Sequence, residues 1–126
     1  HDCDVPLADV FPIIREARVG AFSIEFANPR HQHEYAALKK MGFPKDKILI
    51  PGVIDSTVNY IEHPQVIANR ILEAVDAVGD RERVIAGADC GFGTFAGWEM
   101  VAASVVWAKF AALAEGARLA SRELWG

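Results

Sequence analysis

The chain has 126 residues, with 13 basic and 17 acidic side chains and a formal net charge of −4. This length allows at most one small domain, and 52% hydrophobic residues are enough for a packed core. The acidic balance argues against nucleic acid or an anionic membrane as the main partner. We expect no membrane span, because no apolar run approaches the roughly 18 residues that one needs, and we expect no signal peptide. With two cysteines, the sequence indicates a cytoplasmic protein with reduced thiols.

The first half of the chain predicts two helices and two strands. A helix is expected over Pro6–Arg18, and an apolar strand over Ala21–Phe26. A short helix should end near Met41, because glycine and proline follow it closely. A second apolar strand is expected over Lys47–Pro51.

The second half predicts a helix, a strand and a longer helix. The pattern for the helix His63–Val78 is the clearest, because Pro64 suits the first helical position and Gly79 suits the C-terminal cap. A third strand is expected over Val84–Ala86, and the last helix over Ser104–Leu124. We assign its apolar stripe to the core, and the stripe consists of Val106, Phe110, Leu113, Ala117, Ala120 and Leu124.

This alternation of helices and strands is typical of parallel β-α units, which places the chain in the α/β class. The strands are almost continuously apolar, as expected when both faces of a sheet are covered. Three strands cannot close an eight-stranded barrel, which needs about 250 residues. We therefore expect residues 1–126 to form a single partial domain, about three β-α units from the C-terminal part of a TIM (β/α)8 barrel. Because its sheet edges would stay open, we expect association with another copy or with a missing N-terminal half.

Two strand ends carry residues with candidate chemistry. Cys90 follows a β-branched run and opens a glycine-spaced loop, and Glu25 lies in an otherwise apolar strand. Parallel sheets keep their chemistry at the carboxyl ends of strands, and a buried carboxylate is costly unless it is paired. A metal ion would explain both residues. The alternatives are an inert thiol for Cys90 and an ion pair for Glu25, for instance with Arg30.

Three features together resemble the catalytic half of the cobalamin-independent methionine synthase family: Glu25 at its strand end, Gly52–Asp55, and Asp89–Gly91. The resemblance implies a (β/α)8 barrel and a zinc ion held by a His-x-Cys element, a strand-end Glu and the Cys of an Asp-Cys-Gly segment. It therefore implies Glu25 and Cys90 as Zn²⁺ ligands. In that family the zinc lowers the pKa of a substrate thiol, which then attacks an alkyl carbon. The implied function is zinc-dependent alkyl (methyl) transfer to a thiol.

The sequence motifs most resemble those of a subgroup, the methionine-synthase-like proteins that include epoxyalkane:coenzyme M transferase. Four blocks carry this resemblance, and they are Asn28–His31, Ile50–Ser56, Asp89–Phe95 and Ala114–Ser121. The implied partners are a small thiol, of the homocysteine or coenzyme M type, and an alkyl donor. The resemblance also makes Asp55, Ser56 and Asn59 candidate substrate contacts, with Asp55 as a candidate catalytic residue. A purely turn-forming role for Asp55 is equally consistent with its position.

The start of the chain has two interpretations. His1-Asp2-Cys3 fits the His-x-Cys element literally, so that His1 and Cys3 would join the zinc ligands. In the subgroup, however, a segment like Asp4–Leu7 follows Gly-Pro-His, and the true ligand pair lies further upstream. On this second interpretation the chain is a non-catalytic fragment of a barrel, without a complete zinc site.

Two further positions bear on the chemistry. Methionine synthases proper have a His two residues after the Asp of their Gly-Val-Tyr-Asp turn, and this chain has Thr57 there. That departure argues against methyl transfer from methyltetrahydrofolate to homocysteine and favours another donor or acceptor. Asp89 precedes Cys90, and it either orients this ligand or caps the loop. His31 and His33 lie in a polar segment, which favours a solvated or substrate-facing loop over a metal site.

Overall fold

Three parallel strands form the centre of the structure, in the order β1-β2-β3. The computed structural model describes residues 3–126. The strands are β1 (Ala21–Ile24), β2 (Ile48–Ile54) and β3 (Gly87–Ala88). Both neighbouring pairs, β1 with β2 and β2 with β3, are parallel. The predicted α/β arrangement with a parallel three-stranded sheet is therefore confirmed.

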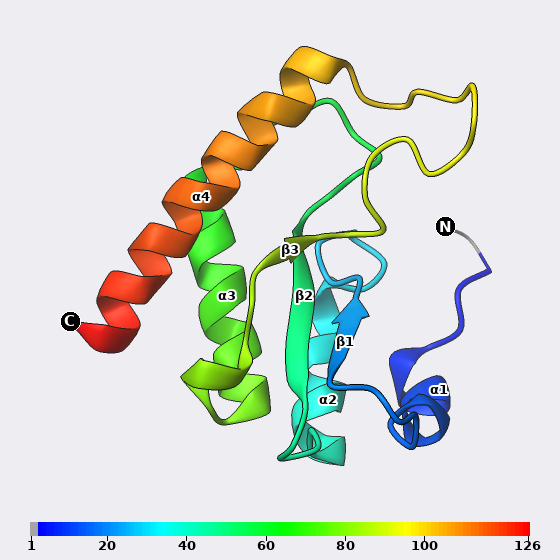
Figure 1. The fold of residues 1–126 in the computed structure, drawn as a ribbon, viewed down its shortest axis with the longest axis vertical. Helices are drawn as coiled ribbons and strands as arrows, with labels where there is room; N and C mark the ends of the chain where they lie inside the picture. The colour runs from blue at the N-terminus through cyan, green and yellow to red at the C-terminus, as the bar shows by residue number, and fades with distance from the viewer. Residues whose placement is uncertain (1–2) are drawn as a thin grey trace.

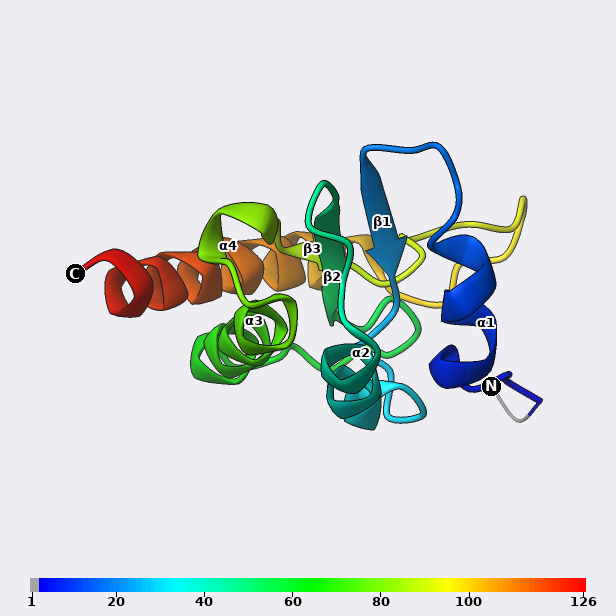
Figure 2. The ribbon, with the colours of Figure 1, turned by 90° about the horizontal axis from the view of Figure 1, so that it is seen from below.

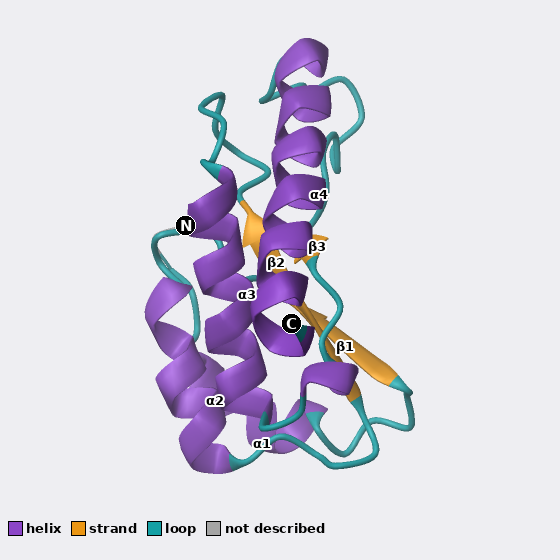
Figure 3. Cartoon of the chain, turned by 90° about the vertical axis from the view of Figure 1, so that its left-hand side faces the viewer, coloured by secondary structure: helices purple, strands orange, loops and turns teal. Residues whose placement is uncertain are grey.

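Helices alternate with these strands along the chain (Figure 1). They are α1 (Leu7–Ile14), α2 (Tyr35–Met41), α3 (Pro64–Val78) and α4 (Ala103–Trp125), with short 3-10 turns η1 (Gln32–Glu34) and η2 (Arg81–Arg83). Helices α2 and α3 lie over one face of the sheet (Figure 2), and no helix of the described residues covers the opposite face (Figure 3). None of the described helices combines the length and the apolar composition that crossing a membrane requires.

The boundaries of β1 and β2 differ from the predicted ones at their carboxyl ends. β1 stops at Ile24, because the N–H of Phe26 donates to the side chain of Asp89 instead of to a neighbouring strand. β2 continues beyond Pro51 to Ile54 and pairs there with β3. The strand ends are thus shaped by contacts between segments far apart in the sequence, which a local pattern does not contain.

The third strand is shorter and later than predicted. The segment Val84–Ala86 forms only an isolated bridge between Val84 and Leu49, and strand pairing begins at Gly87 opposite Gly52, with an irregularity between Gly52 and Ile54. Pro51 lies between these two points on β2 and has no N–H to donate. The predicted strand Val84–Ala86 therefore starts three residues and ends two residues too early.

The ends of two helices show how local signals operate. α1 ends at Ile14 and not at Arg18, and the residues that follow form turns. For α3 the predicted boundaries hold: the His63 side chain accepts the N–H of Gln65, and Gly79 closes the helix in a left-handed conformation with φ 79°. Because a capping side chain marks one end and a glycine the other, the boundaries of this helix can be predicted from the sequence.

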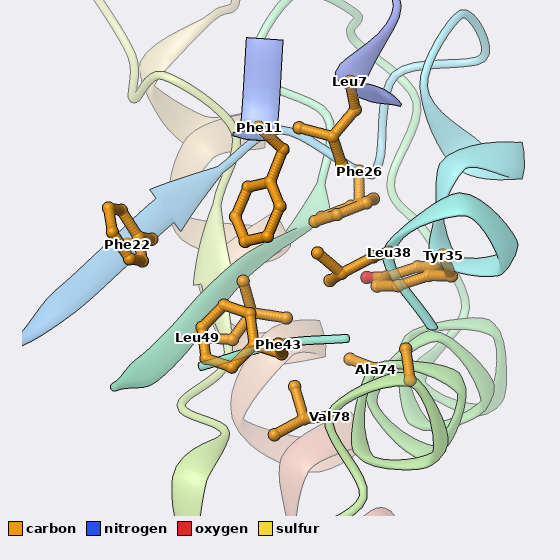
Figure 4. Packing of buried hydrophobic residues seen from close by; sticks show 11 residues of the cluster. Leu7, Phe11, Phe22, Phe26, Tyr35, Leu38, Phe43, Leu49, Ala74 and Val78 are labelled. Atoms are coloured by element: carbon orange, nitrogen blue, oxygen red, sulfur yellow. The ribbon is translucent and has the colours of Figure 1, made fainter. Parts of the chain in front are cut away.

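The core has two clusters. In the first, aromatic rings from α1, β1 and the residues around α2 pack on the sheet (Figure 4). Phe11 stacks on Phe43 with ring centroids 6.0 Å apart, and Phe26 stacks on Tyr35 at 4.1 Å. The second cluster joins β2, α3 and α4, and its large buried residues include Val53, Ile54 and Ile67. Because both clusters contact β2, this strand is the best-packed part of the sheet.

The buried face of α4 matches the predicted apolar stripe in part, since Ala120 is buried and Leu113 and Ala117 pack against the second cluster. Its buried residues are Lys109, Ala112, Gly116 and Ala120, whereas Phe110 of the predicted stripe is 38% exposed. A β-carbon at Gly116 would lie 2.5 Å from Ile67 Cγ2 and 2.9 Å from the Pro64 carbonyl oxygen. Close approach of α4 to α3 selects small residues, and a ranking by hydrophobicity overlooks them.

Candidate functional site

Glu25 and Cys90 meet at the carboxyl edge of the sheet. Glu25 follows β1 directly, Cys90 follows β3 by two residues, and the Cys90 thiol donates a hydrogen bond to Glu25 Oε1. The two residues are 65 positions apart in the sequence and come from strands that are not neighbours. The structure therefore brings together the two residues that the sequence suggested as metal ligands.

The electrostatics of this pair favour the thiol form of Cys90. Partial burial of the sulfur raises the pKa of Cys90 to about 11, and the hydrogen bond to Glu25 and the negative charge of that carboxylate act in the same direction. A thiolate beside a carboxylate is unfavourable, because two like charges would share one site. A cation between them would remove this repulsion.

Asp89 connects the two strand ends. Its Oδ1 accepts the N–H groups of Phe26 and Ala27, both at 3.1 Å, and its Oδ2 accepts the N–H of Asn28 at 2.8 Å. The Asp89 side chain is buried, which raises its pKa to about 6 in spite of these three bonds. The carboxylate thus ties the segment that follows Glu25 to the residue that precedes Cys90.

Gly52 makes room for this connection. A β-carbon at Gly52 would overlap Asp89 Oδ1 and lie 2.8 Å from the Asp89 backbone nitrogen. Since β2 lies between β1 and β3, Asp89 has to pass over the middle strand to reach the residues after β1. A glycine at this point of β2 is what permits that passage.

A cavity of about 640 Å³ opens beside Cys90. Cys90, Ser56 and Thr57 contribute to its wall, and no lysine or arginine is found among the described residues that line it. Most of the remaining wall is apolar or aromatic, and it includes Phe92, Phe95, Trp98, Met100, Val106 and Trp107. The cavity suits an uncharged, largely apolar group next to the sulfur.

The other predicted substrate residues lie in the loop after β2. Asp55 is buried, and its Oδ1 accepts both the N–H and the hydroxyl of Thr57 at 2.7 Å. These bonds form the turn that the sequence allowed for Asp55. Ser56 is buried as well and reaches the cavity wall. A substrate contact of Asp55 or Ser56 stays a prediction.

Asn59 joins two loops. Its amide nitrogen donates to the Met100 carbonyl oxygen and its Oδ1 accepts the N–H of Ala102, both at 2.9 Å. Ala102 is the N-cap residue just before α4, so Asn59 ties the loop after β2 to the start of that helix. The structure gives Asn59 a connecting role, and a substrate contact stays a prediction here too.

A buried ion pair under the same loop was missed by sequence reasoning. Lys109 of α4 is 0% exposed, and its Nζ lies 2.6 Å from Glu62 Oε1, which also accepts the N–H of Asp55 at 3.3 Å. The signal was present, because Lys109 lies between Val106 and Leu113 on the side of the helix expected to be apolar. A lysine there indicates a buried partner.

The remaining candidates lie elsewhere or outside the described residues. Cys3 is exposed, and among residues 3–126 no group of three His, Cys, Asp or Glu side chains is arranged to hold a metal ion. His1 lies outside the described residues. His31 Nδ1 contacts Glu34 Oε2 at 2.9 Å, and Arg30 Nε lies 3.5 Å from Asp4 Oδ2. Of the predicted ligands, the described structure groups only Glu25 and Cys90.

Comparisons with known proteins show the family of the chain and a similar fold. The model of the family described as "Cobalamin-independent synthase, Catalytic domain" matches residues 1–113. A B12-independent methionine synthase from Shewanella sp. W3-18-1, solved in complex with selenomethionine, is similar in fold, with a TM-score of 0.74 and 23% sequence identity. The match covers 92% of this chain and 30% of that one, so the chain spans less than a third of its length. No curated protein matches the chain.

Proposed function

Because the chain belongs to the family of cobalamin-independent synthase catalytic domains, we propose that it contributes to an enzyme that transfers an alkyl group to the sulfur of a substrate thiol. The observation that carries this proposal is the contact between the Cys90 thiol and the Glu25 carboxylate at the carboxyl ends of two parallel strands. This is the edge of the sheet at which β/α barrels place their catalytic residues. We propose in addition that residues 1–126 form one part of such a barrel.

The donor set of this pair fits a zinc ion. Zn²⁺ accepts thiolate and carboxylate ligands, and a soft thiolate favours it over magnesium or calcium. Glu25 and Cys90 would each supply one ligand. When bound, zinc lowers the pKa of a coordinated substrate thiol, as metal ions do for bound water.

Two ligands do not complete a zinc site, which needs three from the protein when it is catalytic. His1 and Cys3 are the nearest candidates in the sequence, on the literal interpretation of His1-Asp2-Cys3. On the other interpretation the missing ligands come from residues outside this chain. Because His1 lies outside the described residues, the group of ligands required by the first interpretation is not fully described, and both interpretations stay open.

The chain's own residues would prepare the cavity for the substrate. The aromatic wall around Phe95 and Trp98 would receive the alkyl group beside the sulfur of Cys90. Ser56 and Thr57 offer hydroxyl groups at the same wall.

The finer assignment rests on Thr57 and on the four sequence blocks of the methionine-synthase-like subgroup. Thr57 stands where methionine synthases proper have a His, and its hydroxyl donates to Asp55. A threonine hydroxyl does not titrate near neutral pH, so it cannot give and take a proton as His does. We propose a thiol alkylation that does not use methyltetrahydrofolate and homocysteine as its preferred pair.

The metal content of the full-length protein tests the proposal. Zinc would be measured by elemental analysis in the wild type, Glu25→Gln and Cys90→Ala, with Glu115→Gln as the matched control on the exposed face of α4. We expect zinc in the wild type and the control and a clear loss in both site variants. Equal zinc in all four proteins, or none in the wild type, would contradict the assignment.

The same measurement on Cys3→Ala separates the two interpretations of the chain start. Loss of zinc from Cys3→Ala would support His1-Asp2-Cys3 as the His-x-Cys element. Full zinc content in Cys3→Ala would place the missing ligands in another part of the protein.

A further inference from the structure

We infer that Asp89 is a positioning residue: it sets the separation of Glu25 and Cys90 by clamping the segment after β1 to the residue before Cys90, across the bare backbone of Gly52. This inference rests on the proposed function, because its readout is metal binding by Glu25 and Cys90. It adds a residue that does not touch the metal and a backbone position that has no side chain at all.

The need for a clamp follows from the strand order. Glu25 and Cys90 follow β1 and β3, and β2 lies between them. Strands two places apart in a sheet are separated by about 10 Å, whereas two zinc ligands must each come within about 2.0–2.3 Å of one point. Both strand ends therefore have to lean over β2, and some contact has to hold them there.

Asp89 is bonded to all three strand ends. Its side chain accepts the N–H groups of three consecutive residues after Glu25, which are Phe26, Ala27 and Asn28. Its own N–H donates to the carbonyl oxygen of Ile54, the last residue of β2, at 3.1 Å. Its chain continues from β3 into Cys90. An asparagine in this position could not accept all three bonds in the same way, because its NH2 group would face one of the three backbone N–H groups, donor against donor.

A loop cap alone would explain less. A cap needs one acceptor for one or two N–H groups of its own loop. Both carboxylate oxygens of Asp89 instead accept N–H groups from a segment more than 60 positions away. It also requires the missing side chain at Gly52, on a third segment. The two segments that it joins are those that carry Glu25 and Cys90, so the clamp and the thiol-carboxylate contact form one structure.

Two variants of the full-length protein test the inference from opposite sides. Asp89→Asn removes an acceptor, and Gly52→Ala leaves Asp89 intact but fills the space under it. The matched controls are Asp80→Asn, because Asp80 caps its own segment by accepting the N–H of Glu82 at 2.9 Å and Arg83 Nε at 3.1 Å, and Gly20→Ala, because a β-carbon at Gly20 meets nothing within 4 Å. Zinc affinity would be measured by competition with a chelator, and ligand geometry by the absorption spectrum of the cobalt-substituted protein.

We expect both site variants to bind zinc about 10–100-fold more weakly, as is typical when a group that orients a ligand is lost, and to show an altered cobalt spectrum. Both controls should match the wild type. Affinity is measured below the unfolding temperature of every variant, since a purely structural role would lower that temperature and leave the affinity of the folded protein unchanged. If Asp89→Asn does not fold, Asp89→Glu replaces it, because it keeps both acceptor oxygens; its longer side chain should weaken zinc binding and change the cobalt spectrum in the same sense.

The failures are distinguishable. If the wild type binds no zinc, the proposed function fails and the inference fails with it. If the wild type binds zinc, and folded Asp89 and Gly52 variants bind it equally tightly with an unchanged cobalt spectrum, the positioning role of Asp89 is wrong while the proposed function stands.

Discussion

At the scale of single residues, Cys90 is exposed and lies outside both core clusters. Its side chain should therefore matter for chemistry and hardly for folding. In the full-length protein we predict that Cys90→Ala abolishes thiol alkylation and changes the stability by no more than about 0.5 kcal/mol, as surface substitutions do. An alkylation assay and thermal unfolding check the two halves separately. Retained turnover, or a variant that unfolds, would each contradict this placement of Cys90.

Thr57 carries a prediction about the substrate pair. Its hydroxyl is held by Asp55 at 2.7 Å and lies at the wall of the cavity, where it cannot serve as a titrating group. We predict weak or no methyl transfer from methyltetrahydrofolate to homocysteine by the full-length protein. Turnover of about 1 per second or more, an ordinary rate for enzymes, would show that Thr57 does not limit this reaction.

At the scale of elements, the contact between α4 and the loop after β2 depends on one buried ion pair. Lys109 Nζ lies 2.6 and 3.1 Å from the two oxygens of Glu62, and both side chains are almost fully buried. Removal of one partner leaves a buried charge unpaired, so Lys109→Ala should cost about 3–5 kcal/mol. Urea unfolding measures this cost.

The matched control for that prediction is Lys39→Ala. Lys39 pairs with Asp76 at 2.7 Å, but both side chains are mostly exposed, so its loss should change stability by less than about 1 kcal/mol. A second check is the double variant Lys109→Met with Glu62→Leu, which removes both charges and should recover part of the lost stability, because it also leaves the Asp55 N–H without its Glu62 acceptor. Equal effects of Lys109→Ala and Lys39→Ala would contradict the burial of the pair.

The packing of α4 on α3 gives a second prediction at this scale. Ala is a better helix former than Gly by about 1 kcal/mol, but at Gly116 its β-carbon would overlap Ile67 and the Pro64 carbonyl oxygen. Overpacking typically costs about 1–3 kcal/mol, and the backbone oxygen cannot move away as a side chain could. Gly116→Ala should therefore lower the free energy of unfolding, with Gly20→Ala as an unaffected control. A stabilised Gly116→Ala would show that the helices separate easily.

Elements defined by local signals were predictable from the sequence. The ends of α3 depend on His63, Pro64 and Gly79, which act on their own neighbours, and the parallel sheet follows from the alternation of apolar strands with helices. The buried face of α4 was predictable only in part by hydrophobicity, since Ala120 of the predicted stripe is buried but the close helix contact also selects Gly116 and Ala112.

The site was predictable in part, and for a different reason. Glu25 and Cys90 were put forward because of their strand-end positions and a family resemblance, and the structure places them in contact. The bonds of Asp89 to Phe26, Ala27 and Asn28 span more than 60 positions. No local pattern encodes such bonds, so the sequence left the role of Asp89 open between an orienting residue and a cap.

At the scale of the whole molecule, the sheet has one face covered by α2 and α3 and one face without a helix among the described residues (Figure 2). The loop before α4 also exposes large apolar side chains, which include Phe95, Trp98 and Met100. Patches of this kind are typical of surfaces that are covered by another part of a protein or by a partner. The structure thus has the exposed surface expected of part of a larger barrel.

We therefore predict that the 126-residue chain, expressed alone, associates with itself or with the remainder of the barrel. Open sheet edges and exposed aromatic residues both favour this association. Sedimentation over a range of concentrations measures it, and addition of the missing half should replace self-association by a defined complex. A monomer that persists at high concentration would contradict the prediction.

The glycine beneath Asp89 has a consequence for how the sheet assembles. Sliding β2 by one residue against its neighbours would put Pro51 or Val53 under the carboxylate in place of Gly52, and would turn every side chain of the strand to the other face. A misaligned sheet could then not form the clamp, and the thiol and carboxylate would stay apart. In the proposed site, metal binding would thus report on strand alignment, because only a correctly aligned sheet brings Glu25 and Cys90 together.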